Sequence, residues 1–369
     1  MSEKLKEEVW DLDRCTGCGL CVAVCNKGVL TFDENVDRHP TTKKFIKLVG
    51  YRTIEINPCI LCKEPCLDVC SRMVDWEPEA LGKIFSLKSN VTGNVVKDLL
   101  FCALELGAID GVVAASLDKW SSKPVIQFTN NPEDMKESPL PVPFFSSGLK
   151  TTTKVKRMGR VAIVGPPCWA QSLKRLENST MDVLEPFQKP KYLKISYLCN
   201  GVFYPDILSE IEKELTIPLW SILKVEVAGK GEELVIQTRN GNKTIALTEL
   251  AKYMAKGCAR CIDFAGEQAD ITIGNIGSEP GSSTVILRTP LGEELVMAAM
   301  KMNKVDLKEP LPGAREELRN FIDAKKKRGS AIEVDKAFLA VINGLKKPVV
   351  DEDALQKLES LSRLEKKED

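Results

Sequence analysis

The chain has 369 residues, enough for two or three compact domains. It carries 52 basic and 52 acidic residues, and this zero net charge argues against a protein that binds nucleic acid or anionic membranes through its overall charge. No apolar run reaches the length of about 20 residues that a bilayer requires. The N-terminus is charged from the start, so we expect no signal peptide, no membrane insertion and a cytoplasmic location.

Cysteine usage is the most informative feature of the composition. The chain has 13 Cys and a single His. In a chain without a signal peptide, this many cysteines indicates reduced thiolates that bind metal rather than disulfides. The single His excludes any metal site that needs two imidazoles.

Two tight cysteine runs lie near the N-terminus. The first reads C-x2-C-x2-C-x3-C and consists of Cys15, Cys18, Cys21 and Cys25. The second reads C-x2-C-x3-C-x3-C and consists of Cys59, Cys62, Cys66 and Cys70. The first spacing is typical of bacterial ferredoxins with two [4Fe–4S] clusters, in which the fourth Cys of a run binds the other cluster.

This ligand exchange predicts two clusters. We expect the first to be bound by Cys15, Cys18, Cys21 and Cys70, and the second by Cys59, Cys62, Cys66 and Cys25. Gly17 and Gly19 allow the first loop to curl, so that amide N–H groups can point at the sulfides. The alternative is a pair of structural zinc sites, but zinc usually takes paired C-x2-C knuckles separated by a longer loop.

The residues between the two runs predict a short β excursion. Residues 45–56 are rich in β-branched and aromatic side chains with partial alternation. His39 lies in the polar segment before them, beside Pro40, and we expect it to be an exposed loop residue.

After Trp76 the pattern changes to alternating helices and strands. Residues 95–117 indicate an amphipathic helix followed by a strand, and residues 160–176 indicate a buried strand, a turn and a helix. Further strands are expected in residues 195–203, 269–278 and 283–289. This alternation predicts an α/β or α+β domain. The charged segments 315–329 and 353–369 have weak apolar faces and are expected to be solvated or partner-docking helices.

Three segments of this domain resemble the beta-subunit family of coenzyme F420-reducing hydrogenase and F420-linked dehydrogenases. They are residues 161–168 (VAIVGPPC), residues 197–201 (YLCNG) and residues 257–278, which begin GCARCIDF and end ADITIGNIGS. The third is the most specific, because its fixed spacing continues to Thr284 and Arg288. The fused ferredoxin resembles the F420H2-dehydrogenase branch of the family. We therefore expect a two-cluster ferredoxin domain at residues 1–80, an α/β domain for FAD, F420 and a further cluster at residues 81–312, and a helical extension at residues 313–369.

The resemblance implies a third [4Fe–4S] cluster, bound by Cys168, Cys199, Cys258 and Cys261. The residues agree with this ligand set, since Cys168 and Cys199 each follow an apolar strand, where α/β domains place their ligands. Cys102 lies within the apolar stretch LLFCALEL and is expected to be a core residue.

The resemblance also implies FAD between bound F420 and that cluster. Residues 90–94 occupy the place of the family's glycine turn, and a basic cluster at residues 150–160 offers positive charge to the phosphodiester and carboxylates of F420. The implied cofactor-binding residues are Gly93, Asn94, Ser146, Ser147, Lys150, Lys154, Gly277 and Ser278.

Together these features predict an F420-linked oxidoreductase subunit. The deazaflavin exchanges a hydride and a cluster passes one electron at a time, so a flavin must lie between them. This chemistry depends on positioning, and we identify no catalytic acid or base. The implied partner is a hydrogenase, formate dehydrogenase, carbon monoxide dehydrogenase, heterodisulfide reductase or complex-I-like arm, with the N-terminal domain as the exit toward it. The alternatives are another flavin iron–sulfur reductase, similar to hydroxymethyl-chlorophyll reductase, and a non-catalytic electron-transfer adaptor.

Overall fold

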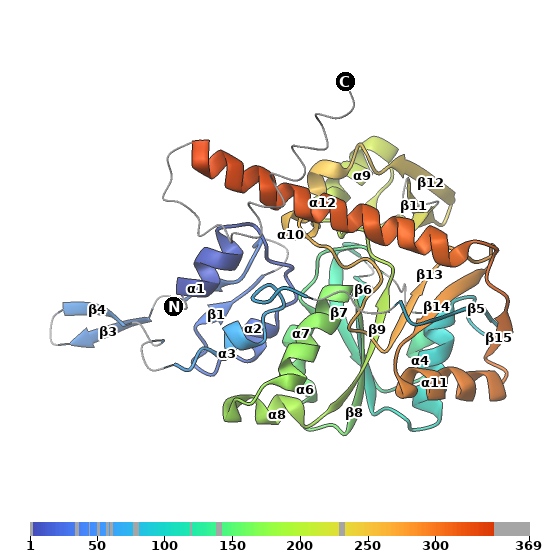
Figure 1. Ribbon diagram of the computed structural model, residues 1–369, viewed down its shortest axis with the longest axis horizontal. Coiled ribbons are helices and arrows are strands. Elements are labelled where there is room, and N and C mark those ends of the chain that lie inside the picture. The colour runs from blue at the N-terminus through green and yellow to red at the C-terminus, as the bar shows by residue number, and fades with distance from the viewer. Residues whose placement is uncertain are drawn as a thin grey trace, which may run out of the picture.

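The computed structural model describes residues 3–33, 37–43, 45–49, 52–56, 59, 62–76, 81–118, 120–137, 142–228 and 233–342. A small N-terminal unit of short elements lies beside a large mixed sheet that has helices on both faces (Figure 1). This arrangement confirms the predicted fold class.

The N-terminal unit consists of short helical turns and two small hairpins. The turns are α1 (Glu3–Leu5), the π-helical η1 (Lys6–Trp10), α2 (Leu20–Ala23) and α3 (Pro65–Asp68). Strands β1 (Leu30–Thr31) and β2 (Thr41–Thr42) form one antiparallel pair, and β3 (Phe45–Val49) and β4 (Arg52–Ile56) form the other. The second pair confirms the predicted β excursion.

His39 differs from the prediction. Its ring is half-buried and stacks on Trp10, with ring centroids 5.3 Å apart and an angle of 8° between the rings. The expectation of an exposed loop residue was wrong, because an imidazole can cover the flat face of a neighbouring indole.

The main sheet has eight strands in the order β15-β5-β14-β13-β9-β8-β6-β7. Their bounds are β5 Lys83–Ser89, β6 Gly111–Leu117, β7 Pro124–Thr129, β8 Arg160–Gly165, β9 Lys191–Tyr197, β13 Ile271–Gly274, β14 Ser282–Leu287 and β15 Val305–Lys308. The four central strands β6, β8, β9 and β13 are parallel, and the strands on either side are antiparallel to their neighbours. Parallel strands end at a common edge, so the segments after β8, β9 and β13 meet there.

Two hydrophobic cores cover the faces of this sheet. Helices α4 (Val95–Glu105) and α11 (Pro290–Lys301) pack on one face, and Cys102 is fully buried there, as predicted. Helix α7 (Pro167–Asn178) packs on the other face, and Leu20 of α2 joins the same core. The N-terminal unit therefore shares a core with the sheet rather than being connected to it only by the chain.

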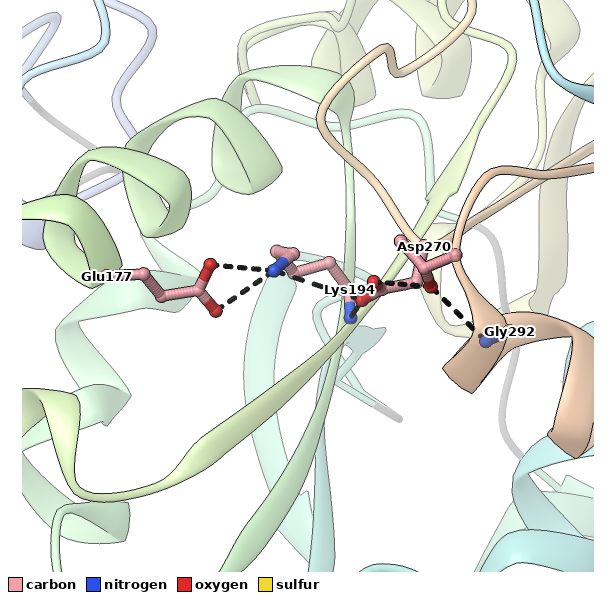
Figure 2. Close-up of polar contacts among 5 residues, drawn as sticks. Glu177, Lys194, Asp270 and Gly292 are labelled. Carbon is pink, nitrogen blue, oxygen red and sulfur yellow. Dashed lines mark hydrogen bonds and ion pairs between the residues drawn. The ribbon is translucent and has the colours of Figure 1, made fainter.

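A polar chain crosses the sheet at its central strand (Figure 2). Lys194 of β9 pairs with Glu177 of α7 at 2.8 Å, and its backbone N–H donates to Asp270. The other oxygen of Asp270 accepts from Thr289, whose side chain caps α11. Because a buried charge requires compensation, these contacts fix β9 and the start of β13 relative to both helices. The carboxyl ends of the same two strands lead into the candidate site.

The remaining elements surround that edge of the sheet. Strands β10 (Ile222–Ala228), β11 (Glu233–Thr238) and β12 (Gly241–Ala246) form an antiparallel sheet, and the same core contains α9 (Ile207–Leu215). Short helices are α5 (Asp134–Glu137), η2 (Gly148–Thr151), α6 (Thr152–Val155), η3 (Asp182–Leu184), α8 (Glu185–Gln188), η4 (Leu219–Ser221), η5 (Ala251–Tyr253) and α10 (Lys256–Ala259).

The long helix α12 (Ala314–Ile342) crosses from the side of β5 and β15 toward the N-terminal unit (Figure 1). It contains the predicted helical segment 315–329, and the other predicted segment, 353–369, lies outside the described residues. In the part of the chain that the structure describes, no helix combines the length and apolarity needed to cross a bilayer.

Candidate functional site

The structure brings together Cys15, Cys18, Cys21 and Cys70, which we call the proximal set. Burial, and then the neighbouring thiols of the set, raise the pKa of Cys15 and Cys21. The loop that carries the first three residues curls through Gly17, whose φ is +69° and whose N–H donates to the sulfur of Cys15 at 3.4 Å. A Cβ at Gly17 would lie 2.0 Å from the ring of Phe145, so glycine serves both the turn and the docking of this loop on the sheet domain.

The second group of four cysteines lines one small cavity in the N-terminal unit. We call Cys25, Cys59, Cys62 and Cys66 the distal set. Leu5, Trp10 and Leu30 supply apolar walls to the same cavity. Burial, with the neighbouring thiols of Cys25 and Cys62, raises the pKa of Cys66 to about 12. A thiol in such a place becomes a stable thiolate only when a metal centre takes the charge.

The third group comes from three separate segments of the sheet domain. Cys168 lies in the first turn of α7, Cys199 lies two residues beyond β9, and Cys258 and Cys261 lie on and just after α10. We call these four residues the body set. Cys258 and Cys261 raise the pKa of both Cys168 and Cys199, which places the pair between the other two.

Two buried cations accompany the body set. Lys325 of α12 is 2% exposed and donates to the carbonyl oxygens of Cys199 at 2.5 Å and Asp263 at 2.8 Å. Arg72, from the N-terminal unit, is 9% exposed, and its pKa is raised by the neighbouring thiols of Cys261 and Cys168. Burial alone would raise the pKa of the Cys261 thiol, but Lys325 and Arg72 outweigh burial and lower it to about 7.

The body set lies next to the proximal set. The backbone N–H of Leu149 donates to the carbonyl of Cys18 at 2.9 Å, and the sulfur of Cys18 lies 3.4 Å from the hydroxyl of Ser172 on α7. A Cβ on Gly257 would lie 2.1 Å from the carbonyl oxygen of Cys15, so the two backbones touch. Cys66 of the distal set, in turn, acts on the pKa of Cys21 of the proximal set. The neighbouring sets are therefore body and proximal, and proximal and distal.

The cysteine sets are not arranged as sites for a single metal ion. Among the described residues, no three Cys, His, Asp or Glu side chains are arranged to hold one metal ion. In a cubane each thiolate binds its own iron, so the four sulfur ligands stand farther apart than around a single ion.

A cavity of about 260 Å³ opens beside the body set, and Cys199 forms part of its wall. Its lining includes the carboxyl ends of β9 and β13 and residues of β10 and α12. Phe264 stacks on Phe321 of α12, with ring centroids 5.5 Å apart and an angle of 15° between the rings, and both rings line the cavity. The polar lining includes the side-chain amides Asn94, Asn200 and Asn275.

The turn at residues 90–94 is organised around an internal carboxylate. Asp98 of α4 is fully buried and accepts from the backbone N–H groups of Asn90, Val91 and Thr92 at 3.0–3.2 Å. These three amides therefore already have an anionic partner. Asn94 lines the cavity and caps α4 by accepting from the N–H of Lys97 at 3.2 Å. Gly93, with a φ of +74°, has open space where a Cβ would be.

The other residues implied by the resemblance lie in two different places. Ser146, Ser147 and Lys150 lie near the N-terminal unit, where Lys150 donates to the carbonyl of Phe32 at 2.9 Å, and Lys154 is exposed on α6. Gly277 and Ser278 follow β13, and the hydroxyl of Ser278 lies 2.7 Å from that of Thr284. The structure places the eight implied cofactor-binding residues apart from one another, and Asn94 of them lines the cavity.

Sequence reasoning missed the contribution of α12. Leu318, Ile322 and Lys325 are buried, and Arg328 donates to the side chain and carbonyl of Asn200. The expectation that segment 315–329 is a solvated or docking helix was therefore incomplete. The spacing of Leu318, Ile322 and Lys325 follows one helical face and was the available signal.

Comparison with known proteins finds family matches in two parts of the chain. Residues 14–74 match a family model described as a 4Fe-4S dicluster domain. Residues 158–312 match the model for the C terminus of the coenzyme F420 hydrogenase/dehydrogenase beta subunit. An uncharacterised protein of Methanocaldococcus jannaschii is 30% identical, and the alignment covers 88% of this chain and 97% of that protein.

The chain belongs to the coenzyme F420 hydrogenase/dehydrogenase beta-subunit family. The F subunit of the F420H2 dehydrogenase from Methanosarcina mazei is 25% identical, over 88% of this chain and 92% of that protein. The coenzyme F420-dependent sulfite reductase of M. jannaschii is 30% identical over 84% of this chain, which corresponds to 50% of that enzyme. These matches confirm the predicted family and support an F420-linked redox role.

A solved structure shows the same fold. A chain of the F420-reducing [NiFe] hydrogenase complex from Methanosarcina barkeri superimposes with a TM-score of 0.64 at 24% identity. The superposition covers 74% of this chain and 99% of that chain.

Proposed function

We propose that this protein is the F420-oxidising or F420-reducing subunit of a larger redox complex. In this proposal, hydride passes between coenzyme F420 and FAD at the cavity beside Cys199. Single electrons then pass through three [4Fe–4S] clusters, held in turn by the body, proximal and distal sets. The observation that carries the proposal is the shared wall: Cys199 belongs both to the cavity and to the body set.

The donor set fits an iron–sulfur cluster at the body set. Nε and Nη2 of the buried Arg72 have no hydrogen-bond partner, and the hydrogen bonds of Lys325 go to two carbonyl oxygens. A buried cation without a counter-charge costs several kcal/mol. A cluster on four thiolates is anionic and would supply that counter-charge.

The cavity fits a flavin ring in chemical character. Its walls are largely apolar, with a few amide groups, and such a lining is usual for cofactor sites. Bound there, FAD would supply the conversion between two-electron hydride chemistry and one-electron transfer. Tyr197, Phe264 and Phe321 would exclude water from the ring, and Asn94, Asn200 and Asn275 would orient its polar edge.

This chain would contribute positioning rather than proton transfer. Burial raises the pKa of Tyr197 well above its ordinary value, so its hydroxyl stays protonated and is no base. Lys325 and Arg328 hold residues 199–200 in place from α12. Asp98 does the same for the turn that leads to Asn94.

The distal set is the proposed exit toward the partner. It is separated from the body set by the proximal set, and the chain's relatives include beta subunits of F420 hydrogenase and F420-dependent formate dehydrogenase. The partner here is one of the complexes predicted from the resemblance. The proposed domain division remains 1–80, 81–312 and 313–369, with the described part of the last packed on the sheet domain.

Anaerobic purification followed by flavin and iron analysis tests the proposal. We expect one FAD and about 12 iron atoms per chain, together with F420H2 oxidation by a small dye. About eight iron atoms would remove the cluster at the body set. Stoichiometric zinc would defeat the cluster assignment, and iron without flavin would favour the electron-transfer adaptor.

Cys62→Ser tests the exit. Because the distal set lies beyond the other two, this variant should keep dye reduction and lose transfer to the protein partner. The point variant is preferable to deleting residues 1–75, because deletion would expose Trp169 and Phe145 of the shared interface.

A further inference from the structure

Arg72 occupies an unusual position for a buried cation. It follows Cys70 of the proximal set by two residues, yet it contacts Cys261 of the body set. Its charge also acts on Cys168 and Cys258 of the body set and on Cys15 of the proximal set. A single guanidinium from the N-terminal unit therefore faces both groups of sulfur ligands.

The segment that carries Arg72 is held firmly. The N–H of Met73 donates to the carbonyl of Cys70 at 3.1 Å, and the indole of Trp76 donates to the carbonyl of Ser71 at 3.0 Å. Ser71 is 1% exposed. These contacts hold the backbone on either side of Arg72, and the burial of its side chain leaves little water to screen the charge.

We propose that Arg72 is an electrostatic bridge between the N-terminal unit and the sheet domain, whose fixed charge raises the reduction potentials of the two clusters that flank it. This inference rests on the proposed function, since it requires clusters at both the body and the proximal sets. The step that it serves is the transfer of one electron from one cluster to the next, with one cluster oxidised as the other is reduced and no proton moved.

The direction of the effect follows from charge. Reduction adds a negative charge to a cluster, and a nearby cation stabilises that charge, so the potential rises. A cation shared by both clusters raises both potentials together. Because both shifts have the same sign, the difference between the two potentials, which drives the transfer across the domain boundary, changes less than either potential does.

The test is a redox titration of the loaded, full-length protein followed by EPR. In Arg72→Gln, we expect the ratio of reduced to oxidised body cluster at a fixed potential to fall at least tenfold, which equals about 59 mV for a one-electron couple. The proximal cluster should shift in the same direction. The distal cluster should not move, because the proximal set lies between it and Arg72. Arg72→Lys keeps the charge and should restore most of the difference.

Lys256→Met is the matched control. Lys256 lies two residues before Cys258 of the body set, as Arg72 lies two residues after Cys70 of the proximal set. Its side chain reaches across the domain boundary, where it pairs with Asp13 at 3.2 Å. Its side chain is 63% exposed, so water and salt screen its charge. We expect its removal to change the ratio by less than twofold.

Two results would overturn the inference. Unchanged potentials in Arg72→Gln with full iron content would show that the charge does not act on the clusters. Loss of the body cluster from Arg72→Gln and Arg72→Lys alike would show that the guanidinium is needed for its shape and not for its charge. Absence of the third cluster from the unaltered protein is a separate outcome, which defeats the proposed function first.

Discussion

The N-terminal cysteine sets and the body set are built in different ways. The proximal and distal ligands come from two short runs, in which two or three residues separate each Cys from the next. The body ligands come from three segments far apart in the sequence, one after β8, one after β9 and one at α10. These segments meet only in the folded protein. Local spacing therefore defines the first two sets, whereas the sheet topology defines the third.

The two regions also differ in how they compensate charge. In the proximal set, the N–H of Gly17 points at the sulfur of Cys15. The body set shares the buried cation Arg72 with the proximal set and has a second one, Lys325 of α12. Backbone amides provide partial charges and side-chain cations provide whole ones, so the body set depends more on tertiary structure.

The largest expected effect is a loss of iron from the body set alone. Cys258→Ser should remove the body cluster and spare the N-terminal pair, because the ligands of the pair lie in their own unit. Iron should fall from about 12 to about eight atoms per chain. Cys102→Ser is the control and should keep all the iron, since Cys102 lies on the buried face of α4. Equal losses in the two variants would show that the ligand assignment is wrong.

The next effect concerns the body set's dependence on α12. Lys325→Met removes a buried cation and leaves the carbonyls of Cys199 and Asp263 without this donor. We expect the unfolding free energy of the loaded protein to fall by about 3 kcal/mol, visible as a lower midpoint in anaerobic thermal unfolding.

The neighbouring lysine provides the control for that measurement. Lys326 pairs with Glu267 at 3.5 Å and its side chain is 30% exposed. Lys326→Met should therefore cost about 1 kcal/mol or less. If Lys325→Met were as mild, the body set would not need its second cation.

A smaller effect is expected at the turn beside the cavity. Asp98→Ala removes the acceptor for three backbone N–H groups and should cost about 2 kcal/mol, with weaker retention of FAD through Asn94. Asp118→Ala removes a similar acceptor from an exposed turn, where it accepts from Trp120 and Ser121. FAD retention should be unchanged in Asp118→Ala. If both variants lost FAD equally, the turn at residues 90–94 would have no specific role in holding the cofactor.

The smallest effect is expected at the exposed contact between the two regions. The pair Lys256 and Asp13 should contribute about 0–1 kcal/mol in a double-mutant cycle of Lys256→Met and Asp13→Asn. A coupling of several kcal/mol would mean that surface charge, rather than the buried contacts of Gly17 and Arg72, holds the N-terminal unit in place.

Much of this architecture was predictable because it is encoded locally. The cysteine spacing indicated the two N-terminal groups, and hydrophobic patterning indicated α4, β6, β8 and α7. The body set needed the family resemblance, because Cys168 and Cys199 carry no spacing signal of their own.

The unpredicted features depend on long-range packing. Lys325 lies in a run of three lysines that is typical of a solvated face, and its helical spacing from Leu318 and Ile322 was the one sign that it is buried. Arg72 follows a cysteine motif and gave no sign that it reaches the other domain. Residues 90–94 occupy the place of the family's glycine turn, and the sequence did not show that Asp98, one helical turn into α4, accepts from the amides of residues 90–92.

The most direct test of the account is stopped-flow reduction of the full-length protein by F420H2. In the unaltered protein, we predict that the flavin band bleaches first and that the iron–sulfur absorbance follows. In Cys258→Ser, the flavin should bleach as before while the N-terminal clusters stay oxidised, because the body cluster is their only route from the cavity in this account. N-terminal clusters that are reduced at the unaltered rate in Cys258→Ser would contradict the proposed order of the three sets.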